Sequence, residues 1–343
     1  MTATVERATG PGTVMRLLTG CLISGAVLAV LTATAFTAQK AVPGIAMPGP
    51  LVVYGLPVLR VLLDLAAVAV VGLSLLSKLL GFDDPERTEP VMRRARPLAV
   101  TFAWAWAVLA LVVIVFQTAE LNPGSLPTPA MIAEYVDSVG AGQGMLFSAA
   151  CALTYAGIGL LAVRFGEKVP AELRIVISFF GLLPIPVTGH AVDSVWHDPI
   201  MISMELHVMG AAAWTGGLVT IIALVAGDRE LLARVLPKFS RLATLALVLV
   251  GVSGLVNGVA TMALTRGVEL PGAVFTSDYG LLVVAKTASV ALLIPFAAHI
   301  RFRLLPLIAE RRGTAVAGWA AAEITVMGLA YGVAVALTTA SMV

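Results

Sequence analysis

Long apolar runs separated by short polar segments dominate this chain of 343 residues. About twenty consecutive apolar residues can cross a bilayer as a helix, and nine runs reach that length. They cover residues 17–38, 51–76, 97–117, 142–163, 171–189, 200–226, 238–262, 279–299 and 315–340. The pattern predicts an all-α fold, a polytopic membrane helix bundle of nine transmembrane helices.

Composition agrees with a membrane protein. The chain is 59% apolar and only 12% charged, with a mean hydropathy of +0.97, whereas a soluble domain is about half apolar and about a quarter charged. It has no Walker loop, no G-x-G-x-x-G fingerprint and no basic patch of the kind that binds nucleic acid. We therefore expect contact with the lipid bilayer, no nucleic-acid partner, no ATP-driven pumping and no enzymatic activity, while an electron-transfer role stays open.

Lys and Arg are distributed unevenly between the two sides of the predicted bundle. Of the 22, 18 lie before the first run or in and beside the segments that follow the second, fourth, sixth and eighth runs. Only Lys40 and Arg266 lie on the opposite side, and Arg60 and Lys286 fall inside runs. Because positive residues stay on the cytoplasmic side, we predict a cytoplasmic amino terminus and an extracytoplasmic carboxyl terminus.

The first run could instead be a secretory signal, but about 22 apolar residues exceed the 7–15 of a signal core, so we expect it to be retained. Cys21 and Cys151 are expected at depths that differ by about 12 Å, too far apart for a disulfide. We divide the chain into an N-terminal membrane region, 1–140, with three helices and an outer loop, and a six-helix membrane domain, 141–343.

Histidine and methionine gather around the predicted turn between the fifth and sixth runs. His190, His197 and His207 fall there together with Met201 and Met204. Imidazole nitrogen and thioether sulfur are ligands that copper favours. We predict a metal site from these five residues near the outer face, with His197 in the exposed loop. The alternative for each residue is a packing or interfacial role.

The same stretch carries signs of distorted and closely packed helices. Pro184 and Pro186 precede His190, and proline leaves carbonyls of the preceding turn unpaired. Such a distortion is tolerated at membrane depth beside a cavity or within protein. The small residues from Gly210 to Gly217, around Trp214, are typical of close helix packing.

Further polar residues could support the site or line a path through the bundle. Acidic residues at the outer face would attract cations, and a protonated lysine would balance a carboxylate or tune the site rather than bind metal. Glu205 does not share the helix face of Met204 and His207. The supporting residues are Asp193, Asp198, Glu205, Asn257, Lys286, Arg60, Asp64, His299 and Glu323.

Several of these residues have a structural alternative. Arg60 and Asp64 are four apart and can pair on one helix face. Asn257 is typical of a helix–helix contact, and His299 of the inner interface, although it could also be an exit ligand. Glu323 is expected nearer the inner face, in an exit path or a proton relay.

A series of short motifs, in order and spacing, resembles the copper resistance protein D (CopD) family. The motifs are Gly189-His190-Ala, His207 followed by Ala-Ala-Ala-Trp214-Thr-Gly-Gly-Leu, Lys238-Phe-Ser-Arg-Leu, Ser253-Gly-Leu-Val-Asn257 and Asp278-Tyr-Gly-Leu-Leu-Val-Val-Ala-Lys286. The resemblance covers about 140–340. It departs at His299-Ile-Arg301, where the family more often has Asn-Arg.

This resemblance implies a multi-pass protein of the bacterial cytoplasmic (inner) membrane that handles copper, usually by moving it inward, often beside a secreted CopC-type carrier. We expect copper uptake, with Cu(I) or Cu(II) captured at the outer His/Met site and passed to a cytoplasmic copper chaperone. Two alternatives stay open. One is a cytochrome with haem b between His190 and His207, and the other is a copper-binding assembly factor that does not translocate the ion.

Overall fold

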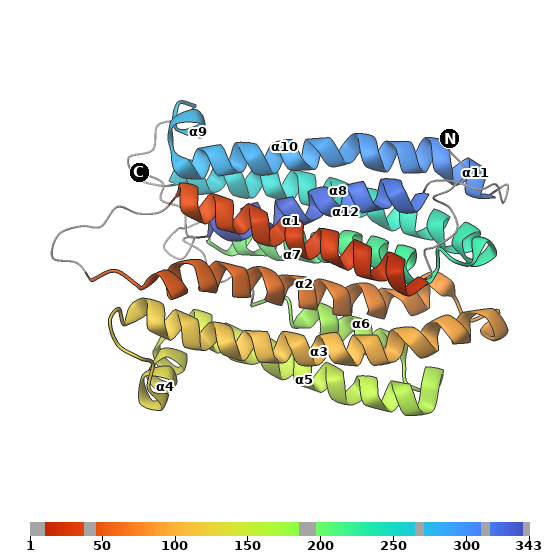
Figure 1. Ribbon diagram of the computed structural model, residues 1–343, viewed down its shortest axis with the longest axis horizontal. Helices are drawn as coiled ribbons and strands as arrows, with labels where there is room; N and C mark the ends of the chain where they lie inside the picture. Colours follow the sequence, from red (N-terminus) through yellow and green to blue (C-terminus); the bar gives the residue numbers. More distant parts are fainter. Residues whose placement is uncertain (1–10, 38–45, 185–196, 265–270, 310–315, 339–343) are drawn as a thin grey trace.

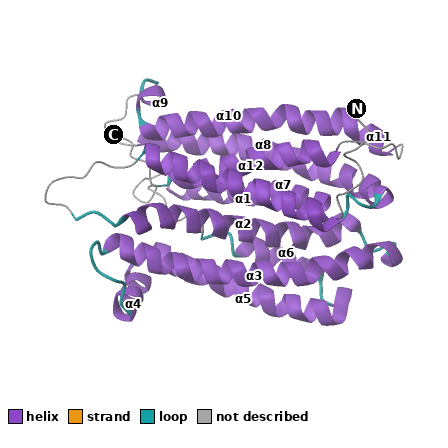
Figure 2. Cartoon of the chain, in the orientation of Figure 1, coloured by secondary structure: helices purple, strands orange, loops and turns teal. Residues whose placement is uncertain are grey.

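The computed structural model describes residues 11–37, 46–184, 197–264, 271–309 and 316–338, and every regular element in these ranges is helical (Figure 2). The long helices are α1 (Pro11–Phe36), α2 (Pro50–Leu80), α3 (Pro85–Leu121), α5 (Gly140–Phe165), α7 (His197–Leu224), α8 (Arg229–Leu264), α10 (Asp278–His299) and α12 (Val316–Leu337). The short elements are α4 (Pro129–Ser138), η1 (Gly166–Lys168), α6 (Ala171–Phe180), α9 (Ala273–Thr276), the π-helical turn η3 (Ile300–Leu304) and α11 (Leu305–Ala309).

The eight long helices are each apolar enough to cross a membrane, which confirms an all-α bundle and eight of the nine predicted runs. They lie roughly parallel to one long axis (Figure 1). Helices α3 and α5 form one side, and α8 and α10 form the other. Helices α2 and α7 pack together between these sides, and α1 packs on α12. Helix α7 therefore contacts both halves of the bundle.

Proline and glycine mark several helix boundaries. Pro50 and Pro85 begin α2 and α3, where the missing proline N–H is not needed for helical pairing. Gly81 and Gly166 follow α2 and α5 with φ of 81° and 63°, values that side chains disfavour. The sequence thus sets sharp turns at the ends of these spans.

The fifth predicted run, 171–189, is not the continuous helix that the apolar pattern predicts. Its helix α6 has only ten residues, about 15 Å, or half the hydrocarbon core of a bilayer. A non-helical turn follows up to Pro184, and residues 185–189 lie outside the described ranges. Proline explains the early end, because it cannot donate to the helical hydrogen-bond ladder.

The turn after α6 nevertheless carries the chain toward the opposite end of the bundle. Gly181 lies against Cys151 in the middle of α5, and Pro184 lies against Gly144 near the start of α5. The Gly181 carbonyl, which no longer belongs to a helix, accepts a hydrogen bond from Ser148 Oγ at 2.9 Å. Trp106 Nε1 donates to the same hydroxyl at 3.0 Å. Interior side chains thus satisfy irregular backbone that lipid could not.

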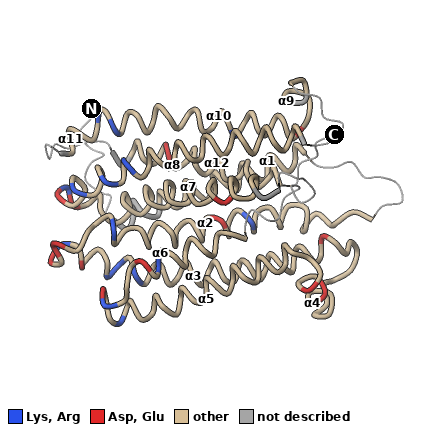
Figure 3. The backbone as a smooth tube through the Cα atoms, turned by 180° about the vertical axis from the view of Figure 1, so that it is seen from behind, with Lys and Arg blue, Asp and Glu red and all other residues tan. Residues whose placement is uncertain are grey.

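Positive charge gathers at one end of the bundle. Figure 3 shows most described Lys and Arg positions at the end where α1 begins, whereas the opposite end carries the acidic positions of α4 and lies beside the end of α12. This arrangement is the one expected if the charged end faces the cytoplasm. Between the two ends, charged positions are few (Figure 3).

Direct backbone contact between glycines holds α2 against α7. A Cβ built on Gly72 would lie 2.1 Å from the Gly216 carbonyl oxygen, and one on Gly216 would lie 2.3 Å from the Val68 carbonyl oxygen. In the same way, a Cβ built on Gly332 of α12 would lie 2.3 Å from the Ala26 carbonyl oxygen of α1. The expected close packing at Gly216 is therefore confirmed, and small residues let these backbones touch.

We predict that Gly72→Ala destabilises the protein, because the new methyl group cannot fit against Gly216. Overpacking of this kind costs about 1–3 kcal/mol. Gly157→Ala in α5 is the matched control, since no atom lies within 4 Å of its Cβ position and alanine is the better helix former. Thermal unfolding in detergent should show a lower midpoint for Gly72→Ala alone, and equal midpoints would contradict the contact.

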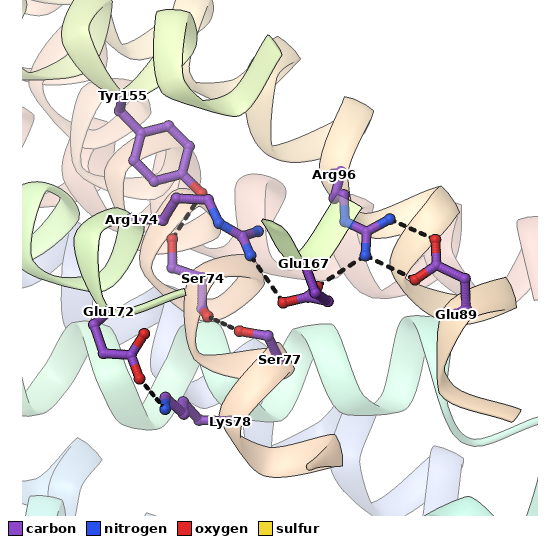
Figure 4. A network of polar contacts seen from close by, with 9 residues as sticks. All are labelled: Ser74, Ser77, Lys78, Glu89, Arg96, Tyr155, Glu167, Glu172 and Arg174. Carbon is purple, nitrogen blue, oxygen red and sulfur yellow. Dashed lines mark hydrogen bonds and ion pairs between the residues drawn. The ribbon is translucent and has the colours of Figure 1, made fainter. Parts of the chain in front are cut away.

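A network of charged and polar groups joins α2, α3, η1 and α6 at the charged end of the bundle (Figure 4). Arg96 is only 3% exposed and binds both Glu89, at 2.6 Å, and Glu167, at 2.8 Å. Lys78 pairs with Glu172 at a more exposed position. A buried guanidinium that holds two carboxylates is costly to remove, because its partners are left unpaired.

Arg96→Gln should therefore destabilise the protein more than Lys78→Gln. Breaking a buried ion pair costs about 3–5 kcal/mol, and we expect the lower part of this range because Glu89 and Glu167 are partly exposed. Exposed pairs such as Lys78–Glu172 contribute little. Unfolding midpoints of the two variants at low and high salt measure the stability that each one loses. Equal losses in the two variants would contradict the role of Arg96 in the network.

Candidate functional site

Four predicted ligand positions follow one another along α7. The helix begins at His197, with Pro199 in its first turn, so the expectation that His197 lies in a loop was wrong. Positions 197, 201, 204 and 207 are separated by four, three and three residues and fall on one stripe of the helix. His207 lies ten residues from the start, about 15 Å along the axis.

His207 is held by α8 through a hydrogen bond that determines which ring nitrogen is free. The ring is 8% exposed, and its Nδ1 lies 3.0 Å from Ser253 Oγ. The Ser253 hydroxyl hydrogen is directed to the Leu249 carbonyl, so Ser253 Oγ accepts from His207 Nδ1–H. This assignment follows from the hydrogen-bond pattern. It leaves the lone pair on Nε2, the atom that could bind a metal ion.

Asn257 connects the same part of α8 to Met204. Its Nδ2 donates to Met204 Sδ at 3.6 Å. The Asn257 side chain is 5% exposed, and its Oδ1 has no hydrogen-bond partner among the described residues. A buried acceptor without a donor is costly. An ion or an ordered water beside Oδ1 would remove that cost.

Three possible ligands lie at this contact of α7 with α8. The set comprises the thioether of Met204, the imidazole Nε2 of His207 and the amide oxygen of Asn257. Gly254 lets the ring pack closely on α8, since a Cβ there would lie 3.0 Å from His207 Cε1. Lys286 of α10 is half-buried and within electrostatic range of the ring. Sulfur and nitrogen donors favour copper over hard cations.

Other predicted ligands fall where the structure does not describe them. His190 and Asp193 lie outside the described ranges, so the haem pair His190–His207 stays a prediction. Position 198 belongs to α7, but the side chains of His197 and Asp198 are not described. Within the described part of the chain, no three His, Cys, Asp or Glu side chains come together as a metal site. Met201 and Glu205 are half-buried on α7.

His299 has a packing contact that explains its position. Its ring stacks on Trp319 of α12, with centroids 4.0 Å apart. This contact favours the structural alternative over a free exit ligand. Glu323, one turn further along α12, is 2% exposed and faces the Trp214 indole, as expected for a buried residue.

Arg60 and Asp64 do not form the direct ion pair that their spacing predicts. Arg60 Nη1 instead donates to Thr338 Oγ1 of α12 at 3.1 Å, and Asp64 lies within electrostatic range only. The reason is that α12 offers an oxygen acceptor to the guanidinium. These two residues lie on α2, away from the His207–Ser253 contact.

Sequence reasoning missed Ser253 and Gly254 as parts of the site. The signal was present, because Ser253 and Asn257 are four apart in one motif and must share a face of α8. What the sequence could not show is that this face meets Met204 and His207 rather than lipid.

Two parts of the chain match models of one protein family. Residues 47–197 match the model described as Copper resistance protein D-like, N-terminal domain, and residues 233–337 match the model described as Copper resistance protein D. The chain is also 27% identical over 161 residues to Copper resistance protein D of Pseudomonas syringae pv. tomato. This aligned stretch covers 43% of this chain and 49% of that protein. The chain thus spans about half the length of this curated relative. No solved structure gives a significant match.

The two matched regions lie on either side of α7, the helix that carries His207. The N-terminal region ends at the first residue of α7. They account for α2 to α6 and for most of α8 to α12, in the order expected from the motifs. This multi-pass membrane protein therefore belongs to the copper resistance protein D family.

Proposed function

We propose that this protein moves copper inward across the bacterial cytoplasmic membrane. The observation that carries the proposal is the buried contact of α7 with α8, where Ser253 engages Nδ1 of His207 and Asn257, one turn further along α8, donates to Met204. An imidazole fixed by a second residue is typical of a metal ligand. The name of the Pseudomonas relative, Copper resistance protein D, supports copper as the ion.

The ion enters from the end of the bundle where α7 begins. The ligands predicted there from the sequence are His190, His197, Asp193 and Asp198, whose nitrogen and oxygen donors suit Cu(II) as well as Cu(I). Deeper along α7, Met201, Met204 and His207 offer softer donors that favour Cu(I). A secreted copper carrier delivers the ion, and a cytoplasmic chaperone removes it on the other side.

The charged end of the bundle faces the cytoplasm in this proposal, because positive residues are retained there. A monovalent ion that crosses inward then gains about 2.3 kcal/mol for each 100 mV of membrane potential. This gain, together with removal of the ion by a chaperone, is sufficient for uptake without ATP.

His207→Ala should weaken copper binding far more than His299→Ala. The first change removes a proposed copper ligand, whereas the His299 ring has a packing role, because it stacks on Trp319. Ser253→Ala should fall between them, since loss of a residue that orients a ligand costs about 10–100-fold in affinity. Titration of purified protein with Cu(I) in competition with a chelator measures these differences.

Equal affinities for wild type and His207→Ala would remove His207 from the site. An absorption spectrum of the same samples tests the haem alternative. A Soret band that disappears in His207→Ala would assign the residue to haem b rather than copper.

Transport itself is tested with radiolabelled copper in proteoliposomes. We expect wild-type vesicles to accumulate copper, more so with a negative inside potential, and His207→Ala vesicles to remain at the level of empty liposomes. Gly157→Ala is the matched control, because its side chain meets no neighbour. Tight binding without accumulation would instead support an assembly factor that holds copper and does not translocate it.

A further inference from the structure

A second set of polar side chains lies on the other side of α7, between α2 and α12. Asp64 of α2 is half-buried inside the apolar bundle. The Tyr331 hydroxyl of α12 is enclosed near Thr215 of α7 and within electrostatic range of Asp64, and it has no hydrogen-bond partner among the described residues. An enclosed hydroxyl that lacks a partner is costly, and an ordered water beside it would remove that cost.

This set continues toward the outer end of the bundle through Arg60. The guanidinium is held by Thr338 and lies within electrostatic range of Glu120. Glu120 is exposed near the end of α3. Ionisable groups therefore extend from the outer surface to Asp64.

On the other side of Tyr331, the set continues toward the charged end. Glu323 lies eight residues before Tyr331 on α12, about 12 Å along the helix, and faces Trp214, the neighbour of Thr215. Among the described residues, no Lys or Arg pairs with Glu323. A buried ionised carboxylate without a counter-charge is costly, so this side chain needs a proton or another cation.

A cavity of about 350 Å³ lies beside Glu323. Its lining is mostly apolar and comes from α7, α8, α10, η3 and α12. Glu323 and Trp214 lie in its wall together with Arg301 and Thr244, and the last two are exposed. Arg301 donates to Thr244 and not to Glu323, so it does not neutralise the carboxylate directly.

The chemistry of this set is suited to protons and not to copper. Its donors are carboxylate and hydroxyl oxygens, whereas the sulfur and imidazole donors lie at the contact of α7 with α8. A proton relay needs only carboxylates, hydroxyl groups and intervening water.

From this arrangement we infer that Asp64, Tyr331 and Glu323 form a proton path through the bundle, separate from the copper site. The inference rests on the proposed transport function and adds a second ion to it. Because proton and copper occupy different groups, they do not compete for one ligand, which favours movement in the same direction. A proton leaves the outer side, is carried by Asp64 and then Glu323, and is released at the inner side, with no electron transferred.

The test measures copper and internal pH in the same proteoliposomes, which contain a trapped pH-sensitive dye. Wild type should accumulate radiolabelled copper while the internal pH falls. Asp64→Asn and Glu323→Gln should lose most of this pH change and retain the affinity for Cu(I), since both leave His207 and Met204 intact. Glu172→Gln, an exposed carboxylate at the charged end, is the control and should behave as wild type.

Copper accumulation with constant internal pH would overturn the proton path and leave copper transport standing. If wild type accumulates no copper, the proposed transport function is wrong. The proton path is then tested by labelling with dicyclohexylcarbodiimide, an apolar reagent for protonated carboxyl groups. Mass spectrometry should find the label on Glu323, decreasing as the pH rises. Unlabelled Glu323 at every pH would overturn the inference.

Discussion

The backbone contact between Gly72 and Gly216 sets the position of α7, and the rest of the molecule depends on that position. With no side chain at either residue, α2 and α7 approach until one carbonyl nearly touches the other backbone. This contact leaves the opposite face of α7 to α8. His207 then meets Ser253, and Met204 meets Asn257. A shift of a few tenths of an ångström at Gly216 would be transmitted along a rigid helix to His207, about 13 Å away.

The interrupted crossing after α5 shows how the bundle tolerates irregular backbone. Helix α6 stops halfway, and Ser148 and Trp106 provide the hydrogen bonds that the turn requires. The chain then returns to α7 through residues 185–196, which include His190. A continuous helix over 171–189 would have carried this histidine at a fixed register on its own helix.

The sequence predicts the architecture better than the site, for a physical reason. Twenty apolar residues in a row have few alternatives to a membrane helix, so eight spans follow from hydropathy alone. The fifth run failed because proline and glycine override apolar length. For the site, spacing along one helix predicted the shared face of Met204 and His207. It could not predict that Ser253 orients His207, that Arg60 turns to Thr338, or that His299 stacks on Trp319, because each depends on which helices become neighbours.

The two faces of α7 divide the polar chemistry of the interior by hardness. Sulfur and imidazole groups lie toward α8, whereas Asp64, Tyr331 and Thr215 lie toward α2 and α12. If the carboxylates were mixed with the soft donors, a protonation event would compete with metal binding at one place. Their separation keeps protonation of the carboxylates apart from the soft donors. Any movement of α7 changes the contacts on both of its faces at once.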